Sequence, residues 1–283
     1  MKQAPAGHNL AGIIPISGRD SKLKLPWPDC MQPLQEDLLS IERSVYECAT
    51  MNCDTIWIIC SDSTAPIIKD RLGDYVVNPN IYDDWNFKKH PNSSKKYIPI
   101  FYTPVLRRHI NRIDSLGWSV LHGALTAFIV SKKISKWVVP TSYYVSFPYG
   151  VYDPLSLKKY RSEIKAGQKV YATFKEKSVR EGLYLPFSFT PDCWLSIRRQ
   201  LNESNTGGDR NLPIKERWSA KNFTLDKIFK HDNIVVDKKV NLEFYYDLDS
   251  WDNLSTFYQS GEKLKKFPSS MIKPYFLRKE ERC

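Results

Sequence analysis

The chain has 283 residues, which is enough for one large domain or two small ones. Hydrophobic residues make up 42% and aromatic residues 13% of the sequence, so the chain is not of the intrinsically disordered class. The formal net charge of +11 favours anionic partners such as nucleotides, nucleic acid or acidic surfaces, but it carries no information about the fold.

The sequence also bears on location. Its first residues lack the basic start and apolar core of a signal peptide. The longest apolar stretch, 118–130, is too short to span a bilayer and contains His122. The six cysteines form no CxxC pair and no zinc-finger spacing with histidine, which indicates reduced core cysteines. We therefore expect a cytoplasmic protein with no membrane segment.

Strands and helices are predicted to alternate along most of the chain. Apolar runs predict buried strands over 11–16, 55–60, 75–77 and 136–139. Helical spacing or good start and stop signals predict helices over 36–52, 64–72 and 118–132, then from Thr190-Pro191 and from Ser250 to Gly261. An alternating pattern over 167–178 predicts an antiparallel strand, whereas 78–97 and 203–209 read as an exposed excursion and a flexible segment.

This order predicts an α/β fold: a Rossmann-like mixed, mostly parallel sheet with helices on both faces. We expect a single domain over 1–262, followed by a basic tail over 263–283.

The first candidate site is the loop after the first strand. Ser17 and Gly18 are followed there by three cations, Arg19, Lys22 and Lys24. Open α/β sheets bind ligands at this edge, and backbone N–H groups near Gly18 with the three cations could neutralise a triphosphate. Neither the Walker A nor the GxGxxG pattern is present. The alternative is a basic surface loop.

The second candidate is a pair of acids late in the chain. Asp247 and Asp249 alternate with apolar residues along a predicted strand, so both can point to one side. Hard oxygen ligands placed just before a helix suit Mg²⁺ that bridges nucleotide phosphates. The alternative is that Asp249 only orients the helix start, while Asp247 is a solvated acid.

The third candidate is the helix start at 117–125, GWSVLHGAL. Its small residues, Ser119 and Gly123 among them, let a helix approach either a ligand or the sheet closely. Ser119 could contact a base or ribose, so we assign both residues to nucleotide binding. Tight helix packing explains the pattern equally well.

In combination, these segments resemble the nucleotide-diphospho-sugar transferase family, which includes MobA-like nucleotidyltransferases. The opening AGIIPISGRDSKLKLPWPD resembles that family's first strand, glycine-rich loop and "KxLLP"-like segment. The later EFYYDLDSWDNL resembles a "DIDTPEDL"-like stretch that supplies an acid to the metal. The motifs are loose, so we expect a divergent member of the family, and a phage origin is one interpretation.

The resemblance implies that a sugar phosphate attacks the α-phosphate of a nucleoside triphosphate in line, with release of pyrophosphate. Arg19 with Lys24 or Lys22 would stabilise charge on the phosphates. Mg²⁺ would bridge the phosphates and would be held by acids including Asp249, with Asp247 as a further ligand.

Two departures from the family pattern bear on activity. The loop has one glycine where the family usually has two or more. The family's central strand ends in an aspartate that binds the metal, whereas here Ser142 follows the strand predicted over 136–139. A hydroxyl is a poor substitute for a carboxylate on Mg²⁺. Asp83 or Asp153 could compensate from a neighbouring loop.

Two functions therefore stay open. One is a Mg²⁺-dependent nucleotidyltransferase that moves a nucleoside monophosphate from a triphosphate to a sugar phosphate or a similar small phosphate. The other is a catalytically impaired relative that serves as a binding or assembly module, with its basic surface on a protein or nucleic-acid partner. The retained loop and acid pair favour the first function, and the missing strand-end aspartate favours the second.

Overall fold

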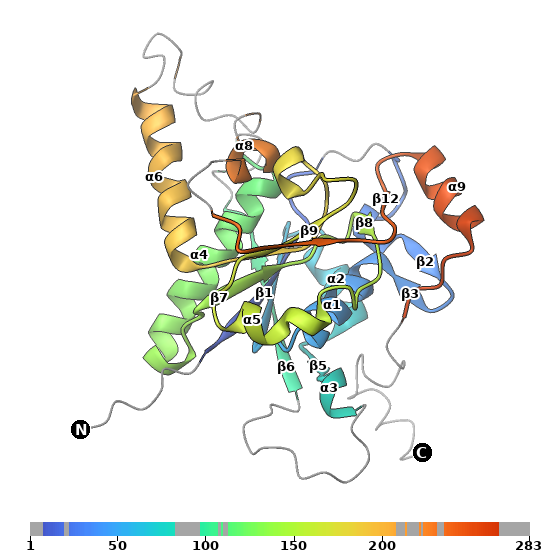
Figure 1. The fold of residues 1–283 in the computed structure, drawn as a ribbon, viewed down its shortest axis with the longest axis horizontal. Coiled ribbons are helices and arrows are strands. Elements are labelled where there is room, and N and C mark those ends of the chain that lie inside the picture. Colours follow the sequence, from blue (N-terminus) through green and yellow to red (C-terminus); the bar gives the residue numbers. More distant parts are fainter. Residues whose placement is uncertain are drawn as a thin grey trace.

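The computed structural model of the chain describes residues 8–19, 23–82, 97–106, 109, 113–207, 213, 221, 223–230 and 235–265. Within these ranges eight strands form one sheet in the order β11-β9-β10-β7-β1-β4-β6-β5. Figure 1 draws the fold and labels β1, β5, β6, β7 and β9 of this sheet. The strands of this sheet are β1 (Leu10–Pro15), β4 (Thr55–Cys60), β5 (Tyr75–Val77), β6 (Tyr97–Pro104), β7 (Ser142–Val145), β9 (Val170–Thr173), β10 (Phe187–Phe189) and β11 (Lys238–Asn241).

The central part of the sheet is parallel. Strands β7, β1, β4 and β6 run in the same direction, and β11 is parallel to β9. Strand β10 is antiparallel to both β7 and β9, and β5 is antiparallel to β6. The mixed, mostly parallel sheet expected from the sequence is therefore confirmed. The strand expected within 167–178 is β9, which is antiparallel to β10 but parallel to β11.

Helices and two small antiparallel pairs of strands complete the described structure. The helices are α1 (Ser40–Thr50), α2 (Ala65–Leu72), α3 (Pro79–Tyr82), α4 (Leu116–Ile134), α5 (Arg161–Lys165), α6 (Pro191–Gly207), α8 (Leu225–Phe229) and α9 (Trp251–Ser260), with the 3-10 helices η1 (Asp29–Met31), η2 (Lys136–Val138), η3 (Lys158–Tyr160) and η4 (Val179–Glu181). The pairs are β2 (Pro33–Gln35) with β3 (Leu38–Leu39), and β8 (Gly150–Val151) with β12 (Tyr246–Asp247).

Helices α1 and α4 cover opposite faces of the sheet, as two glycine contacts show. A Cβ on Gly12 of β1 would lie 3.0 Å from the Cys48 sulfur of α1. A Cβ on Gly123 of α4 would lie 2.9 Å from Ile13, the next residue of β1. Because successive strand residues point to opposite faces, the two helices lie on different sides.

The core is built from the continuous apolar strands. Every residue of β1 is buried, and so is every residue of β4 after Thr55, which is the pattern of a sheet covered on both faces. The five described cysteines are all buried and free, in agreement with the expected core cysteines. Among the described helices, none is both long and apolar enough to cross a membrane.

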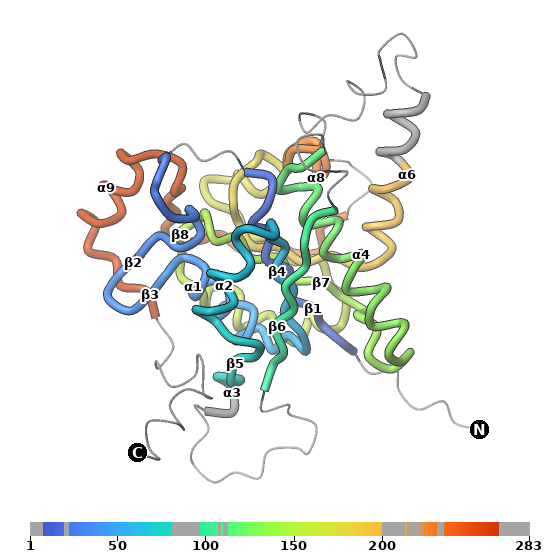
Figure 2. The backbone as a smooth tube through the Cα atoms, turned by 180° about the vertical axis from the view of Figure 1, so that it is seen from behind, coloured from blue at the N-terminus to red at the C-terminus, as the bar shows by residue number. Residues whose placement is uncertain are grey.

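A second, smaller apolar cluster joins the β2–β3 hairpin to α9, at the end of the molecule opposite α6 (Figure 2). It includes Leu34, Leu254 and Leu264. The Gln35 carboxamide holds the backbone of Leu264 on both sides, through bonds of 2.8 and 3.0 Å. The early hairpin and the end of the described chain are therefore packed together.

The strand predicted over 136–139 is wrong. Residues Lys136–Val138 form the exposed 3-10 helix η2, in which the Ser135 hydroxyl accepts a bond from the Trp137 amide. The strand begins six residues after Lys136, so Ser142 pairs with Leu10 at the amino end of the sheet and not at its carboxyl end. Residues 136–139 and β7 (Ser142–Val145) are both rich in apolar side chains. Those of β7 are aromatic and buried, and the strand therefore forms there.

Two further expectations need correction. Residues 203–207 belong to helix α6, although glycine and serine near them suggested a flexible segment. Helix α1 begins at Ser40, because Asp37, with φ of +56°, turns the chain into the β2–β3 hairpin first. Residues 208–209, and most of the excursion expected over 78–97, lie outside the described residues.

Candidate functional site

The loop after β1 leaves the sheet at its carboxyl edge, beside β4. The backbone amides of Ile16 and Ser17 both donate to the Ile59 carbonyl, at 2.8 and 3.0 Å. Gly18 then takes a φ of +86° and lies against Ser115, the N-cap residue of α4. A Cβ on Gly18 would come within 2.3 Å of the Ser115 nitrogen. Only glycine fits this turn, because both its backbone angle and the space around it exclude a side chain.

Three of the residues assigned to nucleotide binding meet in this region. The Ser17 hydroxyl donates to Asp114 at 2.9 Å, and the Ser119 hydroxyl donates to the Ser17 carbonyl at 2.9 Å. Gly18 packs beside them on Ser115. These contacts hold the loop on α4, so the same residues that could face a ligand also fix the shape of the site.

Gly123 has a different place. A Cβ there would lie 2.5 Å from the Ile59 side chain and 2.9 Å from that of Ile13, so this face of α4 rests directly on the sheet. Gly123 therefore lies in the core, between α4 and strands β1 and β4. These surroundings are those expected if its role is tight helix packing.

A carboxylate and an imidazole flank the start of α4. Burial raises the pKa of Asp114 above its ordinary value of 3.8, and the hydrogen bond from Ser17 opposes that rise. Burial lowers the pKa of His122 below 6.5, although its contact with the Pro104 carbonyl and the charge of Asp114 both act in the other direction. Both groups are thus biased toward their neutral forms.

Arg19 is enclosed by residues from three parts of the chain. Its Nη1 donates to Asp29 at 3.0 Å, and its Nη2 donates to the Leu248 carbonyl at 3.1 Å and to the Asp249 carboxylate. The guanidinium carbon also lies 4.1 Å from the centre of the Tyr149 ring. The Arg19 side chain is only 5% exposed, so its charge is directed into the protein.

The electrostatics of this group favour the charged arginine. Burial alone would lower the pKa of Arg19, but Tyr149 and Asp249 outweigh burial, and the pKa is raised. Tyr184 borders the same group, with its ring centre 5.6 Å from the guanidinium carbon. Burial, followed by the charges of Asp249 and Asp247, raises the pKa of Tyr184 to about 12. Arg19 is therefore a permanent cation within an acidic and aromatic enclosure.

The two acids predicted as metal ligands lie on either side of Leu248. Asp247 is in β12, opposite Gly150 of β8, and Ser250 caps helix α9. The Leu248 amide donates to the Tyr149 carbonyl at 2.9 Å, which holds this segment beside Arg19. The structure thus brings Asp249 to Arg19, and the Asp249 carboxylate accepts the arginine's hydrogen bond.

Strand β7 ends without an acid at the carboxyl edge. Val145 is followed by Ser146 and Phe147, and the Ser146 hydroxyl donates to the buried Glu47. Asp153, considered as a substitute ligand, instead accepts a bond from the Leu155 amide at 3.0 Å in a turn. In the part of the chain that the structure describes, no three His, Cys, Asp or Glu side chains group as metal ligands. Asp83 and Lys22 lie outside that part.

A pocket of about 240 Å³ opens beside the Arg19 loop at the same edge. Its lining includes the exposed Lys24, the Trp27 indole, which is 44% exposed, and Thr64 from the turn before α2. Arg19, Asp29 and Tyr149 form its inner side. The pocket therefore has an exposed cation, Lys24, and an aromatic face, Trp27. On its inner side the charge of Arg19 is paired with that of Asp29.

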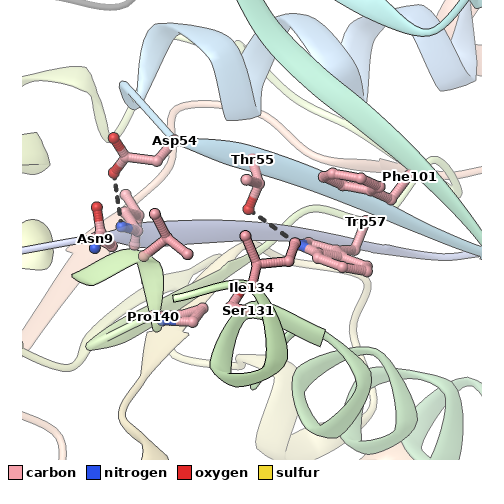
Figure 3. A pocket seen from close by; sticks show the side chains of 10 residues that line it. Asn9, Asp54, Thr55, Trp57, Phe101, Ser131, Ile134 and Pro140 are labelled. Atoms are coloured by element: carbon pink, nitrogen blue, oxygen red, sulfur yellow. Dashed lines mark hydrogen bonds between the residues drawn. The ribbon is translucent and has the colours of Figure 1, made fainter. Parts of the chain in front are cut away.

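A second pocket, of about 160 Å³, lies at the opposite, amino edge of β1 and β4 (Figure 3). Trp57 stacks on Phe101 there, with ring centres 4.4 Å apart, and its indole N–H donates to Thr55. Asp54 accepts a bond from the Leu10 amide at 2.9 Å. This pocket is mostly apolar and contains none of the residues assigned from the sequence.

Three residues of the Arg19 enclosure were not assigned from the sequence: Asp29, Tyr149 and Tyr184. Asp29 lies in the Pro-Trp-Pro-Asp segment, so an acid following a proline-fixed loop was the available signal. The two tyrosines lie in aromatic runs typical of core strands, and nothing in their spacing separates them from their neighbours.

The fold can be compared with solved structures. No protein-family model matches the chain, and none of the curated proteins matches it. A protein described as a glucose-1-phosphate thymidylyltransferase from Bacillus anthracis is similar, with a TM-score of 0.56 and 11% identity over 92% of this chain and 98% of that one. An apo UDP-glucose pyrophosphorylase is similar with a TM-score of 0.52 and 15% identity, over 89% and 97% of the two chains. These likenesses show the fold, which is the α/β fold of the nucleotide-diphospho-sugar transferase type.

Proposed function

We propose that the chain binds a nucleotide, or another phosphorylated ligand, in the pocket beside Lys24, and that it acts as a binding or assembly module. The observation that carries the proposal is the enclosure of Arg19 by Asp29, Asp249 and Tyr149. Because the guanidinium already neutralises two carboxylates, it has little capacity left to stabilise a transferring phosphate.

The lining of the pocket supports this ligand class. Lys24 supplies a positive charge for a phosphate, and the Trp27 indole supplies a face for a base or a sugar. The volume of about 240 Å³ lies below the roughly 300–1,000 Å³ of typical small-molecule pockets. A whole nucleotide would therefore extend beyond the pocket along the carboxyl edge of the sheet.

The described residues do not fit a metal ion held by the protein. Asp249 is bonded to Arg19, and the residues directly after β7, Ser146 and Phe147, are not acids. Asp247 belongs to the same strand end, but no third ligand joins it in the described ranges. Phosphoryl chemistry of this type rests on positioning and on neutralising charge. The Mg²⁺ site expected at Asp247 and Asp249 stays a prediction.

The second candidate function is nucleotidyl transfer. It is favoured by the fold and by the exposed Lys24 at the pocket. An oxygen of a sugar phosphate would attack the α-phosphorus of a nucleoside triphosphate, the bond to the β-phosphate would break, and pyrophosphate would leave. A place among MobA-like enzymes and a phage origin remain predictions of the sequence.

Two measurements separate the candidates. In a thermal-shift screen of the four ribonucleoside triphosphates, we expect at least one to raise the melting temperature, because a ligand of the native state stabilises it. In a pyrophosphate-release assay with a panel of sugar 1-phosphates, we expect no signal above a no-enzyme blank. Sustained release of pyrophosphate would replace the module with the transferase. No shift with any nucleotide at millimolar concentration would remove both.

The partner of such a module is part of the proposal. The formal net charge of +11 favours an acidic protein surface or a nucleic acid. Binding to nucleic acid should weaken steeply with added salt, since it depends on counterion release. Binding to nucleic acid that is absent, or that is insensitive to salt, would remove nucleic acid as the partner.

A further inference from the structure

Asp29, Asp249 and Tyr149 surround Arg19 as ligands would surround a bound cation. Here the cation is a side chain of the protein itself. Asp29 and Asp249 come from segments that are far apart in sequence, and both carboxylates bond the same guanidinium. The side chains of Asp29 and Asp249 are 8% and 19% exposed. Two part-buried carboxylates that bond one group favour a positive charge there, and Arg19 supplies it.

A divalent cation and this guanidinium compete for the same oxygens. Mg²⁺ needs carboxylate oxygens at about 2.0–2.1 Å in octahedral geometry. Arg19 donates to one oxygen of each acid, Asp29 Oδ2 and Asp249 Oδ1. An arginine keeps its proton throughout the accessible pH range, so it does not leave by deprotonation. Tyr149 closes the enclosure over the guanidinium plane, which further holds the arginine in place.

Glu47, the acid bonded to the residue that follows β7, is not available as a replacement ligand. It accepts bonds from Tyr144, Tyr152 and Ser146. That carboxylate is buried within the structure and paired with Arg43 at 3.1 Å. Asp29, Asp249 and Glu47 are therefore each bonded to an arginine of the chain.

We infer that Arg19 is a built-in cation that takes the place of a protein-held divalent ion, and that ligand phosphates bind at Lys24 without one. The first part stands on the geometry of the enclosure, whereas the second rests on the proposed function. The positive charge of the site is then supplied by the protein's own side chains. Removal of divalent ions should therefore leave ligand binding unchanged.

The first part is tested by titrating Mn²⁺ into the full chain and following free Mn²⁺ by electron paramagnetic resonance. The wild type should bind no Mn²⁺ tightly. Arg19→Met should gain one site, with affinity on the order of tenfold or more above the wild type, because Asp29 and Asp249 both lose the guanidinium that bonds them. Arg19→Lys should gain none, since the ammonium keeps the charge. Arg19→Met with Asp249→Asn should lose the gained site.

A matched control uses an arginine elsewhere. Arg71 is paired with Glu42 at 2.6 Å. Arg71→Met therefore also removes an arginine from a carboxylate, but from a single carboxylate where Arg19→Met affects two. It should gain no Mn²⁺ site. One stoichiometric Mn²⁺ in the wild type that disappears in Asp249→Asn would overturn the inference, and this result does not depend on the folding of any Arg19 variant. A folded Arg19→Met that gains nothing would overturn it as well.

The second part is tested by repeating the nucleotide thermal shifts in EDTA and in Mg²⁺. Shifts of equal size in the two buffers support metal-free binding. A shift that appears only with Mg²⁺ overturns it. The absence of a shift in both buffers overturns the proposed function and this second part, while the Mn²⁺ titration still decides the role of Arg19.

Discussion

Arg43 and Glu47 form an ion pair that is completely buried, one turn apart in helix α1, with Nη1 and Oε2 3.1 Å apart. The Glu47 carboxylate also accepts hydrogen bonds from Tyr144, Tyr152 and Ser146. Burial raises the pKa of Glu47, and the charge of Arg43 opposes the rise. Three strand or loop residues that flank the carboxyl end of β7 are thus tied to one helix through a single carboxylate.

We expect Glu47→Leu to lower the free energy of unfolding by about 3–5 kcal/mol, because it leaves the Arg43 charge buried without its partner. Arg43→Met with Glu47→Leu should recover part of that loss, since the double change removes both charges. Urea denaturation at pH 7 measures both values. Lys69→Ala, which breaks the exposed Lys69–Asp74 pair, is the control and should cost less than about 1 kcal/mol.

Gly18 offers a second stability test with a matched control. Gly18 and Gly182 have nearly the same backbone angle, with φ of +86° and +84°, but a Cβ on Gly182 would meet nothing within 4 Å. Gly182→Ala should cost about 1 kcal/mol, from backbone strain alone. Gly18→Ala should cost about 3 kcal/mol, because the methyl group also meets the Ser115 backbone. Equal losses would show that the loop can move away from α4.

The strands and helices at the centre of the fold were predictable because their signals are local. β1, β4 and α4 follow from apolar runs and helical spacing, and these patterns directly reflect burial. The strand near residue 140 was misplaced because Trp137 and Val138 are apolar but exposed. Apolar residues are often found on protein surfaces, so a run of four does not by itself fix the position of a strand.

The candidate site was predictable only in part, and for a different reason. The sequence brought Arg19 and Asp249 into one site, and the structure does place them together. It gave no sign that they would pair with each other, since their separation of 230 positions carries no information on direct contact. Charge and spacing predict which residues gather at a sheet edge. Whether a cation faces a ligand or a neighbouring carboxylate depends on packing.

Lys24 provides a direct test of the pocket. Lys24→Ala should weaken the binding of the most stabilising nucleotide by on the order of tenfold, since it removes a charge-assisted contact with a phosphate. Lys175→Ala is the matched control, because Lys24 and Lys175 are both exposed and have φ of +50° and +48°. Isothermal titration calorimetry measures both variants. If the two substitutions have the same effect, the pocket beside Trp27 is not where the nucleotide binds.

His122 predicts how stability depends on pH. Burial lowers its pKa in the folded chain below the ordinary 6.5, so at pH values below 6.5 the unfolded chain binds more protons than the folded one. Stability should therefore fall as the pH decreases below 6.5 and recover as it rises. The neighbouring Asp114 has a raised pKa and acts with the opposite sign, in a window that begins near 3.8. The pKa of Glu47 is also raised by burial, so the contribution of His122 is read from the difference between the wild type and a His122 variant.

His122→Gln should flatten that dependence, because a glutamine can still donate to the Pro104 carbonyl but takes up no proton. Above pH 7.5 the wild type and the variant should run parallel, since the imidazole is neutral in both the folded and the unfolded chain there. This parallel region serves as the internal control for any change that the substitution makes in packing. An unchanged slope below pH 6.5 in the variant would mean that a group other than His122 carries the dependence.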